Sequence, residues 1–109
     1  MTECILVLTT MPAGGRADGL ARTLVEERLA ACVNVHGPMT STYRWQGAIE
    51  VEAERQVVIK TTRESLAALE VRLRELHPYE LPELIVLDAS ASDAYAAWIS
   101  ETTRSPRPA

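Results

Sequence analysis

The run from Ala48 to Thr62 constrains the fold of this chain more than any other segment. Its first half alternates between apolar residues and glutamates, and its second half contains the continuous apolar run Val57-Val58-Ile59. Alternation is typical of a strand with one solvated face, whereas a continuous run indicates a strand buried on both faces. The two halves together predict one strand far longer than the average of about 5–6 residues.

A second segment is predicted to pair with this strand as a hairpin. Residues 40–45 are rich in Thr, Tyr and Trp, which suit a pleated surface, and Gln46-Gly47 indicates a tight turn before the long strand begins. Val33-Asn34-Val35 opens the partner strand, which Gly37-Pro38 interrupts. The hairpin is therefore expected to project beyond the sheet and to offer unpaired edge groups.

The remaining segments add a strand, three helices and a final strand around this hairpin. Leu66, Leu69, Leu73 and Leu76 recur at helical spacing, and helical spacing also extends from Asp18 with nothing to break it before Cys32. The other predicted strands are residues 4–9, expected to be buried, and residues 84–87. The predicted capping or first residues of the helices are Asp18, Arg63 and Ser92. The order is therefore β-α-β-β-α-β-α.

With right-handed crossovers, this order predicts an α+β, ferredoxin-like fold with an extra C-terminal helix. Four antiparallel strands would carry two helices on one face, in a single domain of residues 1–104 followed by a disordered tail, 105–109. The other face would be bare, and exposed apolar patches usually mark an interface. Self-association is therefore expected, and a closed ring suits strand edges that pair head to tail. The aromatic and branched residues of the hairpin add to this patch: Tyr43, Trp45, Ile49 and Val51.

Charge and motif content exclude several classes of function. The net charge of −4 and the pI of about 5.1 argue against nucleic acid or an anionic membrane as a partner. No apolar run approaches the ~18 residues of a membrane span, so a cytosolic protein with Cys4 and Cys32 as reduced thiols is expected. The sequence shows no nucleophile–base constellation, no phosphate-binding glycine loop and no Cys-x-x-Cys pair, so an enzyme is the weaker interpretation.

The segment from His77 to Glu83, His-Pro-Tyr-Glu-Leu-Pro-Glu, gathers titratable and aromatic side chains on a backbone that two prolines stiffen. It either holds a ligand or simply ends a helix, in which case a cationic His77 would suit the helix dipole. Lys60 is expected either to pair with Glu80 or Glu83 or to contact an anionic ligand.

Two further features also have two interpretations. Cys32 is either a metal or redox thiol or a small buried hydrophobe. The row Glu50, Glu52 and Glu54 is typical of a solvated strand face, and a weak cation-binding strip is the alternative.

Several motifs occur in an order and spacing that resemble the CutA family, the divalent-cation tolerance proteins. They are residues 29–35 (Leu-Ala-Ala-Cys-Val-Asn-Val), 41–47 (Ser-Thr-Tyr-Arg-Trp-Gln-Gly), Lys60-Thr61-Thr62, His77 to Glu83, and Tyr95 with Trp98. The resemblance extends from about Cys4 to Thr103. It implies a tight homotrimer similar in architecture to the PII signalling proteins, a cytosolic location, a role in copper or divalent-metal tolerance, and no established catalytic activity.

The metal ligands that the resemblance implies are incomplete in this chain. The family places copper ligands on a thiol at the end of the first strand and on two histidines, and these positions are Thr9, Leu76 and His77 here. A lone imidazole holds copper poorly, so Cys32, Glu80, Glu83 or donors of a neighbouring subunit are expected to assist His77. Copper is the expected metal and zinc the alternative.

Two other functions remain open for such a trimer. A PII-like module would bind a small metabolite between subunits, near Tyr43, Lys60, Thr61, Tyr79 and Glu83. A scaffold trimer would depend on its interface, for which Trp45, Ile49, Val51 and Trp98 are the candidate residues.

Overall fold

The strands and helices follow one another in the order that the sequence predicts. A computed structural model describes residues 1–104, so the predicted tail 105–109 lies outside the described residues. The second predicted strand is divided in two by the interruption at Gly37-Pro38. The elements are β1 (Thr2–Pro12), α1 (Arg16–Glu26), β2 (Cys32–Val35), β3 (Met39–Trp45), β4 (Ala48–Thr61), α2 (Arg63–Leu76), β5 (Ile85–Ala91) and α3 (Asp93–Thr103).

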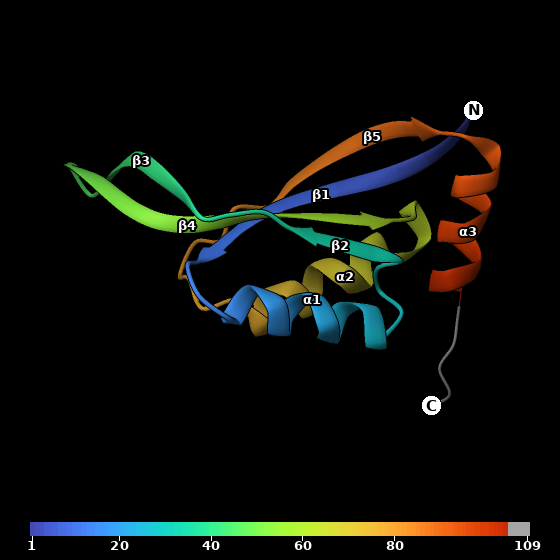
Figure 1. Cartoon of the computed structure of the whole chain (residues 1–109), viewed down its shortest axis with the longest axis horizontal. Coiled ribbons are helices and arrows are strands. Elements are labelled where there is room, and N and C mark those ends of the chain that lie inside the picture. The colour runs from blue at the N-terminus through green and yellow to red at the C-terminus, as the bar shows by residue number, and fades with distance from the viewer. Residues whose placement is uncertain (105–109) are drawn as a thin grey trace.

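The strands form one antiparallel sheet in the order β2-β4-β1-β5, with β3 paired to the outer half of β4. The long strand β4 therefore pairs with β2 and β1 in its inner half and with β3 in its outer half. Figure 1 shows the result, in which the β3–β4 hairpin extends well beyond the body of the sheet. This topology confirms the ferredoxin-like prediction.

The core lies between the sheet and the pair of helices α1 and α2. Alternation along β1 directs Ile5, Val7, Thr9 and Met11 toward these helices, and all four are fully buried or nearly so. The helices contribute Leu20, Leu24, Leu69 and Leu73 to the same cluster, and β4 contributes Val57 and Ile59. The predicted leucine spacing of α2 is thus confirmed as its buried stripe.

Helix α1 differs from its prediction at both ends. Asp18 was expected to cap it, but the helix begins at Arg16, and Gly15 at the N-cap makes no side-chain capping bond. The helix ends at Glu26, because Arg28 adopts a left-handed backbone with φ of 62° and the N–H groups of Leu29 and Ala30 turn back to the Leu24 carbonyl. The spacing of apolar residues continues beyond this point because Leu29 still packs on the core.

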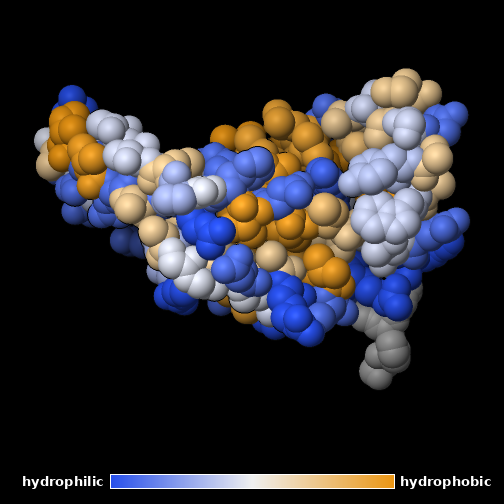
Figure 2. Space-filling view, viewed as in Figure 1, coloured by the Kyte–Doolittle hydropathy of each residue, from blue (hydrophilic) through white to orange (hydrophobic). Residues whose placement is uncertain are grey.

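The opposite face of the sheet is partly covered at one end by α3. Ile99 of this helix packs with Cys4 and Ala31, and Cys4 is a buried core residue. Between α3 and the hairpin, the strands present an apolar strip, which we call the open face: Leu6, Leu8, Val58, Ile85 and Leu87. Figure 2 shows an apolar surface in this middle region.

Candidate functional site

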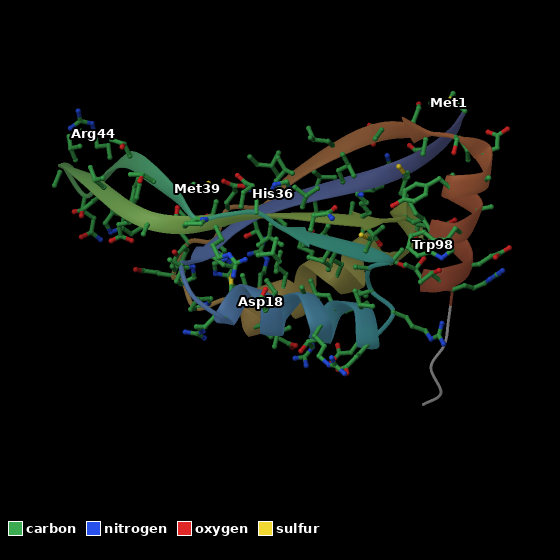
Figure 3. The ribbon with its side chains drawn as sticks, in the orientation of Figure 1. Met1, Asp18, His36, Met39, Arg44 and Trp98 are labelled. Atoms are coloured by element: carbon green, nitrogen blue, oxygen red, sulfur yellow. The ribbon has the colours of Figure 1, made fainter. Side chains whose placement is uncertain are left out.

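A cleft of about 830 Å³ lies between the hairpin and the segment 78–83. The hairpin supplies side chains of β3 and β4, and the proline-stiffened segment after α2 supplies the facing wall. Figure 3 shows Met39 at the base of the hairpin and Arg44 near its tip. The lining residues are Thr10, Met39, Ser41, Tyr43, Trp45, Glu52, Glu54, Gln56, Pro78, Tyr79, Glu80, Leu81 and Glu83.

The two walls of the cleft are joined by a hydrogen bond between Tyr79 and Glu54. The Tyr79 hydroxyl donates to Glu54 Oε2 at 2.6 Å, and Glu54 is only 6% exposed. Burial raises the pKa of Tyr79 most, and the hydrogen bond and negative charge of Glu54 raise it further. The phenol therefore stays protonated and remains a donor at neutral pH.

The cleft has a negative electrostatic character. Desolvation raises the pKa of Tyr43, and the nearby charges of Glu52 and Glu54 add to this shift. Among the described residues that line the cleft, there are four glutamates and no Lys, Arg or His. Glu54 was expected to share a solvated face with Glu50 and Glu52, but it is buried against Tyr79.

His77 ends α2 as predicted, but it is not a cationic helix terminator. Its ring is buried, and its Nε2 lies 2.8 Å from the Thr10 carbonyl while the Tyr79 N–H donates to Nδ1 at 3.1 Å. These two partners assign the neutral tautomer with the proton on Nε2. Burial lowers the pKa of His77, which also favours the neutral ring. His77 thus fastens the start of the cleft wall to β1.

The predicted metal ligands do not meet within one chain. His77 uses both ring nitrogens in hydrogen bonds, Glu80 lines the cleft, and Cys32 begins β2 opposite Lys60. No three His, Cys, Asp or Glu residues among 1–104 form a group that could hold a metal ion. Thr9, at the position of the expected thiol, is fully buried.

The predicted ligand residues divide into two groups. Tyr43, Tyr79 and Glu83 line the cleft, whereas Lys60 and Thr61 do not. Lys60 was expected either to pair with Glu80 or Glu83 or to contact an anionic ligand. The pairing is wrong, because Lys60 points toward α3, where its Nζ lies 3.5 Å from the Tyr95 hydroxyl. Gln56 Nε2 donates to Glu83 instead, at 3.0 Å. Thr61 is buried, and its hydroxyl donates to the Leu29 carbonyl at 2.8 Å.

Sequence reasoning did not single out four lining residues of the cleft, Thr10, Met39, Ser41 and Gln56, and it considered Glu52 and Glu54 only as members of a cation-binding strip. The available signal was the hairpin itself, because side chains on one face of a projecting hairpin must face whatever packs beneath it. The predicted fold did not specify that the segment after α2 returns beneath the hairpin.

Three of the four predicted interface residues are exposed. Ile49 and Val51 of the hairpin are 59% and 62% exposed, and Trp98 is exposed on α3, where its ring lies 5.4 Å from that of Tyr95. Trp45 is half-buried and lines the cleft. Within residues 1–104, no helix has both the length and the apolar character needed to cross a membrane.

Comparison with known proteins agrees with this architecture over nearly the whole chain. The family model of the CutA1 divalent ion tolerance protein matches residues 5–102. The Divalent-cation tolerance protein CutA of Thermus thermophilus is 42% identical over 99 residues, which cover 90% of this chain and 96% of that protein. The solved structure of CutA from Synechococcus elongatus has a TM-score of 0.88 and 45% identity, and covers 94% of this chain and 92% of its own.

The description of one solved relative names a location other than the predicted cytosol. The Archaeoglobus fulgidus structure, described as a periplasmic divalent cation tolerance protein CutA, has a TM-score of 0.87 at 29% identity. The alignment covers 94% of this chain and 100% of that one. The fold, the extent of the family match and the identity to these relatives agree, and the chain therefore belongs to the CutA1 divalent ion tolerance family.

Proposed function

We propose that this protein is a non-catalytic homotrimer of the cytoplasm that associates with divalent cations. The homotrimer is supported by the open face together with the edge strand β5. Three consecutive residues of this strand, Ile85, Val86 and Leu87, are between 41% and 45% exposed. A run of exposed apolar residues on an unpaired edge favours contact with another chain.

Cation association is supported by the names of the relatives and by the donors on the chain. Carboxylates of Glu80 and Glu83 suit zinc, whereas the Cys32 thiol suits copper(I). His77 would have to release the Thr10 carbonyl or the Tyr79 N–H before it could bind a metal. Because the donors of one chain do not converge, we propose that a neighbouring subunit completes the site.

Native mass spectrometry tests the assembly and the metal in one experiment. The protein is sprayed alone and with one equivalent of Cu(II) or Zn(II) per chain. We expect a trimer that binds metal in stoichiometric steps and loses this capacity in His77→Ala. His36→Ala is the matched control, because His36 is the second histidine and is exposed. A monomer, or equal metal binding by both variants, contradicts the proposal.

A second function is favoured by the cleft itself. Its volume lies within the range of about 300–1,000 Å³ that small-molecule sites occupy. We therefore also propose that the protein is a binding module for a small metabolite, whose site is the cleft and not the surroundings of Lys60.

A further inference from the structure

The lining of the cleft favours a ligand with an apolar body. Tyr43, Trp45 and Tyr79 present aromatic rings, and Met39 and Leu81 add apolar surface. Sites for small organic molecules combine such walls with a few polar groups that orient the ligand. A cleft of about 830 Å³ is also far larger than a bare metal ion requires.

The polar groups of the cleft favour a positive charge on that ligand. Within the described part of the chain, the charged residues that line it are all glutamates: Glu52, Glu54, Glu80 and Glu83. Two of them, Glu52 and Glu54, already raise the pKa of Tyr43, so their field reaches the aromatic wall. The carboxylates are distributed around the cleft and do not form a metal-holding group among residues 1–104. A cation extended over several atoms matches this distribution better than a metal ion.

We propose that the cleft binds an organic cation, an ammonium or guanidinium group on an aromatic or aliphatic body. The cationic group faces Glu52 and Glu54 on β4, and the body lies among Tyr43, Trp45 and Tyr79. Aromatic faces attract such cations in addition to the carboxylates. The Tyr79–Glu54 hydrogen bond holds the two walls in place before the ligand arrives. This inference rests on the second proposed function and does not require the metal site.

The two tryptophans of the chain provide the readout. Trp45 lines the cleft, whereas Trp98 lies on α3 at the other end of the molecule (Figure 3). Benzylamine is titrated into the ¹⁵N-labelled full-length protein, with benzoate as the anion of similar size and shape. We expect benzylamine to shift the indole N–H resonance of Trp45 but not that of Trp98, and we expect benzoate to shift neither.

Charge-neutral variants locate the contact. Glu54→Gln retains an acceptor for the Tyr79 hydroxyl. Glu54→Gln and Glu52→Gln should each weaken benzylamine binding by about fivefold or more. Glu101→Gln is the matched control, because it removes the same charge from exposed α3 outside the cleft. Native mass spectrometry with Zn(II) on the same samples keeps the metal proposal separate.

Three results would overturn the inference. One is the absence of any Trp45 shift up to about 20 mM benzylamine, a weak limit for so small a ligand. The others are equal binding of benzoate, and equal weakening by Glu101→Gln and Glu54→Gln. If the protein is a trimer that binds Zn(II) but shows no Trp45 shift, the proposed association with divalent cations is supported and only the binding of an organic cation in the cleft is contradicted.

Discussion

At the scale of single residues, two buried threonines on paired strands differ in one hydrogen bond. The Thr9 hydroxyl is buried and has no hydrogen-bond partner among residues 1–104, whereas the Thr61 hydroxyl donates to the Leu29 carbonyl. Valine has nearly the same shape and no hydroxyl, so Thr9→Val should stabilise the protein by about 1 kcal/mol and Thr61→Val should destabilise it by about as much. Urea unfolding at one protein concentration measures both changes. A loss of stability in Thr9→Val contradicts the assignment of its hydroxyl.

The ring of His77 makes a pH-dependent contribution to stability. Burial lowers its folded pKa below the ordinary 6.5, so on acidification the unfolded chain binds this proton first. Its contribution is complete above pH 6.5 and is lost as the pH falls from there through the folded pKa. With a chelator present, the melting temperature of the wild type should therefore fall more steeply from about pH 7 to pH 5 than that of His77→Gln. His36→Gln should follow the wild type, and a steeper fall in His77→Gln would refute the assignment.

Residue roles could be predicted from the sequence only where local backbone signals determine them. Two prolines made the end of α2 at His77 predictable, but the partners of its ring are a β1 carbonyl and a loop N–H that only the fold brings near. Glu54 shows the same limit. Alternation placed it correctly on one face of β4, but the Tyr79 that buries it is 25 residues away in sequence.

At the scale of elements, replacing two glycines by alanine should change stability in opposite directions, although an added Cβ has free space at both positions. Gly47 has φ of 85° in the hairpin turn, whereas Gly19 lies within α1, and a Cβ at either position would meet no atom within 4 Å. Gly47→Ala should cost about 1 kcal/mol because a left-handed backbone strains alanine. Gly19→Ala should stabilise by about 0.5–1 kcal/mol because alanine loses less entropy in a helix. Thermal unfolding of both variants tests the pair, and equal effects would contradict it.

Element boundaries were predictable where a specific residue type begins or ends the element. Thr62 and Ser92 cap α2 and α3 through bonds to the N–H groups of Ser65 and Tyr95, and Gln46-Gly47 forms the predicted turn. The end of α1 was not predictable, because its left-handed residue is Arg28 and not the glycine or asparagine that usually signals such an end. Leu29 packs on the core although it lies outside the helix, so the apolar pattern in the sequence continues beyond the last helical residue.

At the scale of the whole molecule, the topology followed from element order, but the cleft depended on how far the hairpin projects. Right-handed crossovers leave few arrangements for a β-α-β-β-α-β chain, so the sheet order could be predicted without any long-range contact. The cleft forms where β3 continues along β4 beyond β2, above the segment after α2. The interruption at Gly37-Pro38 lies between β2 and β3, and the sequence does not specify how far β3 then continues along β4.

The open face supplies the last prediction, which concerns assembly. Leu87 lies on this face at 43% exposure, and Val71 is an apolar residue of α2 with 59% exposure. A glutamate buried in a contact between chains would lose its hydration without a partner, so Leu87→Glu should convert a trimer into monomers. Val71→Glu should leave the protein a trimer, because α2 lies on the other side of the sheet. This is expected even though Val71 is more exposed than Leu87. Sedimentation equilibrium measures both masses. If Val71→Glu dissociates the protein and Leu87→Glu does not, subunits meet through the helices and the open face serves another purpose.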